Sequence, residues 1–323
     1  MGDILLTTPL VRAIRARHPD AWITYLTKTP FLGLLEHNPR INQLIGYDPV
    51  KPLRPLAAHL AAETFTDCLD LHGSLRTRAL RLLVPGRWHG YPKHRAARSL
   101  LIYGKKNWYR DRRPVVERYF DAARALDVTP DGQPLEFFLR RDALDRATRF
   151  LSERALGRER ALVAVCPGAQ HATKRWPVRS WQHLVTLLTT RGYDVVVLGG
   201  PAEAALGEDV AAAGAEHAAS AAGRAEFAVS AAFLKLARCA VSGDTGLLHL
   251  ATAVGTPVVG LYGPTVEAFG FFPYRARATV LQRDLPCRPC SAMGGPSCPL
   301  GHHQCLAGIG PDEVFDAVRR LPR

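Results

Sequence analysis

A glycine-flanked turn, Gly243-Asp244-Thr245-Gly246, joins a short apolar segment to a helix-like run that contains His249. Exposed backbone N–H groups at such a helix start attract anions and suit a diphosphate. Asp244 would cap the helix and could accept hydrogen bonds from sugar hydroxyls, while Thr245 could donate to a phosphate oxygen. A plain cap beside a packed histidine would explain Asp244, but not the clustering of Asp, Thr, Gly and His. The turn is therefore a candidate diphosphate-binding site.

Two other turns also follow apolar, strand-like segments. Residues 167–177 contain Lys174 and Arg175, which could neutralise the charge on a leaving diphosphate or could equally be solvated surface. The turn Gly199-Gly200-Pro201 precedes Glu203, which could hold ribose hydroxyls or simply favour a helix start. Ligands of open parallel sheets bind outside the carboxyl ends of the strands, and all three turns fall at such ends.

Strand-like and helix-like segments alternate along the chain, which favours an α/β fold of parallel sheets and crossover helices. The 323 residues fit two domains of roughly 150 residues each. We expect the domains to be residues 1–155 and 156–323, because a short polar stretch follows residue 156. The expected strands are residues 22–27, 43–47, 65–71, 162–166, 193–198, 240–242 and 257–261. The expected helices are residues 9–17, with Thr8 as the cap, and 116–126, 141–154, 178–190, 202–213, 230–238, 247–254 and 311–321.

The formal net charge of +13 is concentrated between Arg76 and Arg118, where thirteen Lys or Arg residues stand against only Asp111 and Glu117. Such a stretch attracts nucleic acid, an anionic membrane surface or an acidic glycolipid, and it could also be a solvated face. No apolar run is long enough to span a bilayer, and the N-terminus lacks a secretory signal, so a cytoplasmic protein is expected. No early Gly-x-Gly-x-x-Gly supports a dehydrogenase.

Four of the seven cysteines, Cys287, Cys290, Cys298 and Cys305, have the spacing C-x2-C-x7-C-x6-C. Four soft ligands in a compact loop could bind a structural zinc ion away from the chemistry. Reduced thiols, or disulfides formed on oxidation, are the alternative, since the spacing is tighter than in ordinary zinc ribbons.

Taken together, these segments resemble glycosyltransferase family 9, the ADP-heptose:lipopolysaccharide heptosyltransferases. The resemblance rests on five segments in family order that span nearly the whole chain. They are Gly2 to Leu10, Lys174-Arg175-Trp176-Pro177, Gly199-Gly200-Pro201-Ala202-Glu203, Gly243 to Ala251, and Gly255 to Thr265. The Asp-Thr-Gly-Leu-Leu-His-Leu-Ala run with its Gly-Pro-Thr end is the most specific of them.

The resemblance implies the GT-B architecture, in which two Rossmann-like domains face each other. The N-terminal domain would bind the acceptor and the C-terminal domain the ADP-sugar. It implies an inverting transfer with no catalytic cofactor, in which Asp3 is the general base and Lys174 stabilises the departing ADP. The donor would be bound by Gly168, Lys174, Glu203, Asp244, Thr245 and Gly246, with His249 supporting the turn.

The resemblance also sets expectations for the N-terminus and the partners. Family members begin with an apolar strand before the Gly-Asp pair, and this chain begins at that pair, so we expect the first strand to lie upstream of Met1 in a longer polypeptide. The expected partners are an ADP-sugar, an anionic lipopolysaccharide precursor of the lipid A–Kdo type and, peripherally, the inner membrane, without nucleic acid. The rival interpretations are a non-catalytic or truncated nucleotide-sugar-binding protein and a family member that uses another nucleotide sugar.

Overall fold

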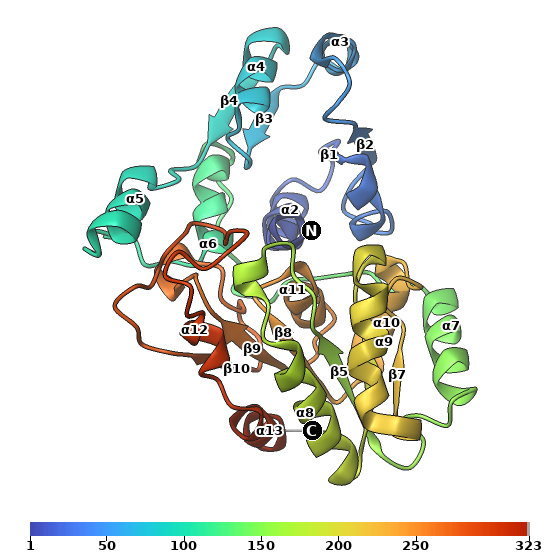
Figure 1. Ribbon diagram of the computed structural model, residues 1–323. Coiled ribbons are helices and arrows are strands. Elements are labelled where there is room, and N and C mark those ends of the chain that lie inside the picture. Colours follow the sequence, from blue (N-terminus) through green and yellow to red (C-terminus); the bar gives the residue numbers. More distant parts are fainter. Residues whose placement is uncertain (322–323) are drawn as a thin grey trace.

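Six parallel strands form the main sheet of the computed structural model, which describes residues 1–321 (Figure 1). Their order is β10-β9-β8-β5-β6-β7, and every neighbouring pair is parallel. All six strands lie in the C-terminal half, by which we mean residues 156–321. The expected fold class, α/β with parallel sheets, is confirmed. The strands are β5 (Ala161–Cys166), β6 (Tyr193–Val197), β7 (Ala218–Ser220), β8 (Cys239–Gly243), β9 (Val258–Tyr262) and β10 (Ala278–Gln282).

Helices cover both faces of this sheet, because successive side chains of a buried strand point to opposite sides. In β5, Val163 and Val165 pack with α8 (Val178–Thr190), α9 (Ala204–Ala211) and α13 (Pro311–Arg320). Leu162, Ala164 and Cys166 of the same strand pack with α7 (Arg141–Ser152), α10 (Phe227–Leu236) and α11 (Gly246–Ala253) on the other side. The continuous apolar sequence of this strand follows from burial on both faces.

The N-terminal half, residues 1–155, contains two separate pairs of parallel strands. Strand β1 (Thr24–Lys28) pairs with β2 (Gln43–Tyr47), and β3 (Asp67–Asp70) pairs with β4 (Arg87–Gly90). The other helices of this half are α1 (Gly2–Leu5), α2 (Thr8–Arg17), α3 (Leu53–Ala62), α4 (Leu75–Leu83), α5 (Arg95–Gly104) and α6 (Val115–Tyr119). In the chain as a whole, short 3-10 segments are η1 (Thr29–Leu34), η2 (Phe120–Leu126), η3 (Ala172–Lys174), η4 (Pro201–Glu203), η5 (Ala212–His217) and η6 (Glu267–Phe269), and the short helix α12 (Gln304–Ala307) precedes α13.

The first helix joins the two halves through one buried core. Helix α1 packs against α11, and Leu5 and Leu6 share a buried cluster with Leu248. Helix α2 begins at Thr8, with Thr7 as its cap residue, so the expected cap at Thr8 is wrong. The reason is local: the Thr8 hydroxyl donates to the Leu5 carbonyl at 2.7 Å and is therefore taken up by the end of α1.

A second junction involves the segment expected as one helix over residues 116–126, which the structure divides into α6 and η2. Arg118 of α6 is buried and donates to the carbonyl oxygens of Ala268 and Phe269. The Val115 backbone N–H donates to the Gly270 carbonyl at 2.9 Å. These bonds attach the end of the N-terminal half to the loop that follows β9.

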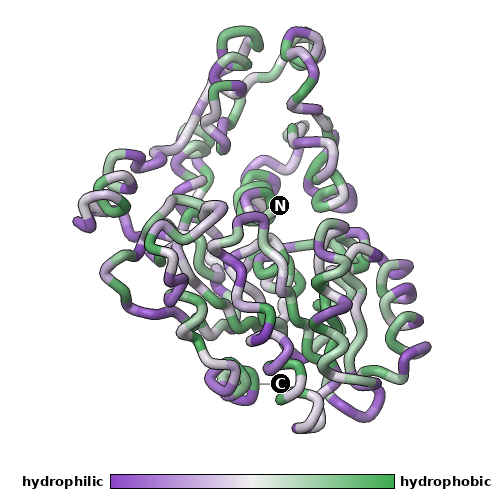
Figure 2. Tube along the Cα trace, viewed as in Figure 1, coloured by the Kyte–Doolittle hydropathy of each residue, from purple (hydrophilic) through white to green (hydrophobic). Residues whose placement is uncertain are grey.

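Hydropathy follows this arrangement. Figure 2 shows hydrophobic residues concentrated in the layers around the six-stranded sheet and hydrophilic residues around the end of α5. Within residues 1–321, no helix has the length and apolar character needed to cross a bilayer.

The junction at Gly270 gives a stability prediction. Gly270 has a φ of +88°, and a Cβ there would lie 2.7 Å from the Val115 nitrogen. We expect Gly270→Ala to lower the free energy of unfolding by more than about 2 kcal/mol, from left-handed strain plus the clash. Gly255 is the control, because its φ of +80° is similar and nothing lies within 4 Å of its Cβ position. Urea unfolding measures both variants, and equal losses would contradict a close contact at Gly270.

Candidate functional site

The turn after β8 leads into a helix start that no side chain caps. Thr245 is the cap residue of α11 and makes no side-chain cap hydrogen bond. The expected capping role of Asp244 is therefore wrong. Its carboxylate instead accepts a hydrogen bond from the Thr265 hydroxyl at 2.7 Å and forms an ion pair with Lys174. The first-turn N–H groups of α11, which no side chain caps, can bind an anion.

Lys174 and Asp244 form a largely buried ion pair. The Lys174 Nζ lies 2.6 Å from Asp244 Oδ2, and the two side chains are 15% and 8% exposed. The expected proximity of Lys174 to this turn is thus confirmed by the geometry. Strands β5 and β8 are neighbours, with Cys166 opposite Ser242, so the loops after them emerge side by side. An ion pair that is held away from water interacts strongly with any further charge placed beside it.

Neighbouring loops hold both ends of this ion pair, through contacts that were not predicted from the sequence. The Thr173 backbone N–H donates to the Gly295 carbonyl at 3.2 Å, and the His303 ring bonds the Thr173 carbonyl at 3.0 Å. Arg288 donates to the Thr265 carbonyl at 2.8 Å. Thr265 follows β9, and its position after a strand could have marked it as a candidate site residue. Arg288 and His303 lie in the cysteine-rich loop, by which we mean residues 287–305, and no local sequence pattern marks them.

His249 lies at the centre of the expected catalytic residues. It is 3% exposed, and its Nδ1 has no hydrogen-bond partner within residues 1–321. Burial lowers the pKa of His249, while the negative charges of Asp244 and Asp3 oppose that shift and the positive charge of Lys174 reinforces it. A Cβ on Gly2 would come within 2.9 Å of the His249 ring. The structure therefore brings the N-terminal segment and the Asp244 turn to the same histidine.

Asp3 is solvent-exposed in the first turn of α1, and its charge acts on Tyr25 and Tyr91. Burial, followed by the charge of Asp3, raises the pKa of Tyr91 to about 12. Burial also raises the pKa of Tyr25 to about 12, with a further contribution from Asp3. Asp3 is thus an accessible carboxylate of the N-terminal half, on a helix that packs against α11.

Gly168 and Glu203 meet at the ends of β5 and β6. Glu203 Oε2 accepts a hydrogen bond from the Gly200 N–H at 2.7 Å. A Cβ on Gly168 would overlap Glu203 Oε1 at 1.9 Å, so only glycine allows the carboxylate to lie there. Strand β5 lies between β6 and β8. Glu203, which follows β6, and Asp244, which follows β8, therefore lie on opposite sides of the β5 end.

The four C-terminal cysteines are free thiols of the cysteine-rich loop, with Cys305 in α12 at its end. Cys305 is buried and the other three are half-buried. Burial, and then the neighbouring Cys298 and Cys287, raise the pKa of Cys290. The thiols are therefore near one another, although no group of three or more His, Cys, Asp or Glu residues in the described part of the chain is arranged to hold a metal ion.

Comparison with known proteins gives consistent matches. The sequence model of glycosyltransferase family 9 (heptosyltransferase) matches residues 53–299. Lipopolysaccharide heptosyltransferase 2 of Salmonella typhimurium is 27% identical over 343 aligned positions, covering 99% of this chain and 95% of the relative. A family 9 glycosyl transferase structure from Veillonella parvula covers 99% of this chain and 94% of its own, with a TM-score of 0.80 at 23% identity. The E. coli ADP-heptose lps heptosyltransferase II structure gives 0.74 at 24% identity and covers 99% and 95%. These two structures share the fold of this chain.

The buried His249 predicts a pH dependence of stability. Its folded-state pKa lies below the ordinary value, so unfolding takes up a proton once the pH falls below about 6.5. The stabilisation is complete above that pH and is lost as the pH falls towards the lowered folded-state pKa. We expect His249→Asn to show a smaller loss of unfolding free energy than the wild type between about pH 7.5 and 5.5. His183→Asn, at an exposed position on α8, is the control. Equal pH slopes in all three proteins would contradict a buried neutral His249.

Proposed function

This chain belongs to glycosyltransferase family 9, the heptosyltransferases, and we propose that it transfers heptose from ADP-heptose to the inner core of lipopolysaccharide, on a lipid A–Kdo acceptor. The observation that carries the proposal is the Lys174–Asp244 ion pair beside the uncapped start of α11, at the carboxyl ends of a parallel sheet. Positive charge and free N–H groups at this position suit a diphosphate leaving group.

In the proposed donor site, three strand ends divide the ADP-heptose between them. Thr245 and Gly246 would bind the diphosphate at the start of α11, and Asp244 would accept hydrogen bonds from heptose hydroxyls. Glu203 would accept from the ribose hydroxyls, with Gly168 leaving room for the close approach. His249 would support the turn through Gly2, which lies against both the His249 ring and the Gly246 backbone. These roles assign residues 156–323 to the donor and residues 1–155 to the acceptor; the last two residues lie outside the described part of the chain.

In the proposed chemistry, the acceptor hydroxyl oxygen forms a bond to the anomeric carbon while the bond from that carbon to the β-phosphate oxygen breaks. Configuration inverts, and Asp3 takes the hydroxyl proton. A sugar hydroxyl is a poor nucleophile, so an accessible carboxylate beside it lowers the barrier. ADP leaves as an anion, and Lys174 and the α11 N–H groups stabilise the charge that grows on it.

We further propose that the protein contacts the cytoplasmic face of the inner membrane peripherally. Tyr103 and Trp108 are 85% and 70% exposed at the end of α5 and in the following loop. Lys106 and Arg110 stand beside them in the sequence and are exposed. Exposed Trp and Tyr with neighbouring cations fit the interface of an anionic bilayer, where the acceptor also resides.

The cysteine-rich loop carries a separate proposal, a structural zinc ion held by Cys287, Cys290, Cys298 and Cys305. The support is the presence of four thiols in one loop region, close enough to raise one another's pKa. Four thiolates form a common tetrahedral zinc site. Binding would have to draw the thiols closer together than they are here.

Lys174 gives the first functional prediction. We expect Lys174→Ala to lower kcat by about 100- to 1,000-fold, the usual effect of removing one group that stabilises transition-state charge. The KM for the acceptor should change much less, because Lys174 acts on the leaving group. Lys51→Ala, an exposed lysine of the N-terminal half, is the control. Steady-state transfer kinetics decide the point, and an unchanged kcat would remove Lys174 from the mechanism.

The zinc proposal gives a second prediction. Protein purified without chelators should contain about one zinc per chain, and Cys290→Ser should lower both the zinc content and the melting temperature. Cys68→Ser, outside the loop, should change neither. A zinc content near zero in the wild type would end this proposal and leave the transferase assignment untouched.

A further inference from the structure

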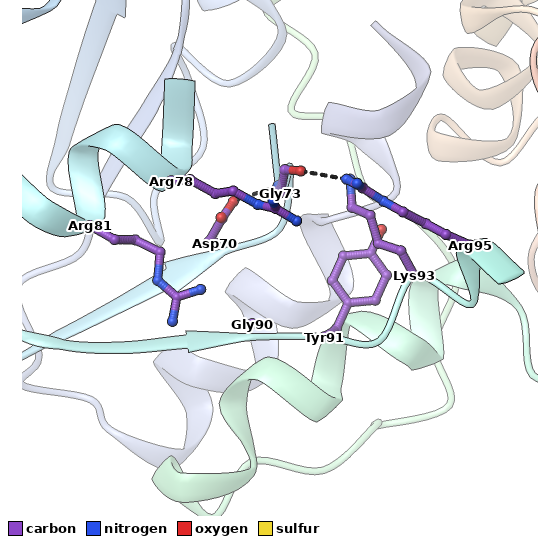
Figure 3. Close-up of a pocket in the computed structure, with 8 residues that line it drawn as sticks. All are labelled: Asp70, Gly73, Arg78, Arg81, Gly90, Tyr91, Lys93 and Arg95. Atoms are coloured by element: carbon purple, nitrogen blue, oxygen red, sulfur yellow. Dashed lines mark hydrogen bonds between the residues drawn. The ribbon is translucent and has the colours of Figure 1, made fainter. Parts of the chain in front are cut away.

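Helix α5 is held by one half of the molecule at its start and by the other half at its end. Arg95 is its first residue, and Figure 3 shows the Arg95 guanidinium donating to the Gly73 carbonyl, at 2.9 Å, in the turn after β3. Lys105 is the cap residue at the other end, and its Nζ donates to the carbonyl oxygens of Cys287 and Pro289, at 2.9 and 2.8 Å. The helix therefore connects a strand-end turn of the N-terminal half to the cysteine-rich loop of the C-terminal half.

The end of α5 also takes part in a buried apolar contact between the halves. Leu101 and Ile102 of α5 share a buried cluster with Phe269, which lies in the loop after β9. Ala292 of the cysteine-rich loop packs against the same cluster. Apolar burial thus fixes α5 against two loops of the C-terminal half at once, and Lys105 extends that contact with two hydrogen bonds.

Lys105 has a backbone conformation that glycine usually provides. Its φ is +53°, in the left-handed region, and helices commonly end with a glycine in this conformation. Gly104 comes immediately before it but is the last residue of the helix. A lysine is less favourable than a glycine at the left-handed position, so the contacts of its side chain, and not the turn itself, account for its presence there.

The two carbonyl groups that Lys105 holds belong to the residues on either side of Arg288. The Arg288 guanidinium donates to the carbonyl oxygens of Gly263 and Thr265, just after β9. It also donates to the side-chain oxygen of Gln282, the last residue of β10, at 3.0 Å. Arg288 therefore joins the segment that Lys105 holds to the ends of two neighbouring strands.

Thr265 continues this connection into the proposed donor site. Its hydroxyl donates to Asp244 Oδ2 at 2.7 Å, and the same oxygen lies 2.6 Å from the Lys174 Nζ. Each step from Lys105 to Lys174 is therefore a hydrogen bond, an ion pair or a pair of adjacent residues. A shift of the Arg288 segment would move the Thr265 backbone, and with it the hydroxyl that orients Asp244.

We propose that Lys105 is a positioning residue of the donor site. It holds the Arg288 segment against α5, so that the Thr265 hydroxyl keeps Asp244 oriented for the nucleotide sugar. A residue of the N-terminal half then sets the affinity for a ligand of the C-terminal half. Packed side chains and hydrogen bonds can carry such coupling, and a measured coupling is what establishes it. The inference rests on the proposed function, because it adds a residue on which the same donor site depends.

The first test is Lys105→Met, which removes the ammonium group and keeps the length of the side chain. We expect the KM for the donor to rise about 2- to 30-fold, the usual range for a residue that acts on a site through others. The KM for the acceptor should rise less. Lys51→Met is the control, because the Lys51 ammonium has no hydrogen bond or ion pair within residues 1–321. Equal donor KM values in the two variants, or equal rises of donor and acceptor KM in Lys105→Met, would overturn the proposal.

A double-mutant cycle with Thr265→Val tests the route. This substitution removes the hydroxyl that orients Asp244, so it should raise the donor KM by itself. If Lys105 acts through that hydroxyl, the double variant should have a donor KM close to that of Thr265→Val, because changes within one network are not additive. A double variant whose rise equals the product of the two separate rises would show that Lys105 acts independently, and the proposal would fail.

Hydrogen exchange separates failure of this inference from failure of the proposed function, because it needs neither donor nor turnover. In the ligand-free protein, Lys105→Met should speed amide exchange in residues 260–270, and Lys51→Met should not. If the wild type transfers no heptose but this difference is present, the link between α5 and the Asp244 turn stands without the transferase. If the wild type transfers heptose and both the exchange rates and the donor KM are the same in all three proteins, the proposed function stands and this inference fails.

Discussion

The ion pair between Lys174 and Asp244 constrains the loops around it, because both charges are largely removed from water. A buried charge is tolerated only when a partner and further hydrogen bonds compensate it. Asp244 obtains that compensation from the Thr265 hydroxyl, and Arg288 in turn holds the Thr265 backbone. The lysine end is fixed through Thr173, whose backbone bonds to Gly295 and His303. The cysteine-rich loop therefore positions the proposed donor site without contributing a group to the chemistry.

The placement of Asp3 depends on packing between distant parts of the chain. Nothing within five residues of Asp3 distinguishes it from an ordinary helix-start carboxylate. Its position beside His249 follows from the burial of Leu5 and Leu6 against α11. Apolar burial of this kind is non-directional, so it is the close approach of Gly2 to the imidazole that fixes the register of α1 on α11.

Sequence patterns located the elements best where burial is regular. The bounds 178–190 agree with α8, whose buried Trp181, Leu184, Val185 and Leu188 recur at helical spacing. The bounds 43–47 also agree with β2. Helices α4 and α5 were not predicted, because arginines interrupt their apolar faces. Strand β4 was not predicted, because none of its four residues is fully buried. The strand-end turns could be read as a site, but the partner of Asp244 could not. Its carboxylate turns from the helix start to Lys174 and Thr265, which a sequence window does not contain.

The orientation of the Asp244 carboxylate affects how the proposed donor site can bind a diphosphate. If Asp244 capped α11, its carboxylate would occupy the N–H groups that a diphosphate needs, and two negative groups would compete for one helix start. The ion pair removes that competition: Lys174 draws the carboxylate aside and leaves the first turn of α11 without a side-chain cap. A diphosphate that binds there then contacts uncapped N–H donors and the ammonium group of Lys174, which Asp244 already orients. The same ion pair that makes Asp244 a poor helix cap thus makes the turn a better anion site.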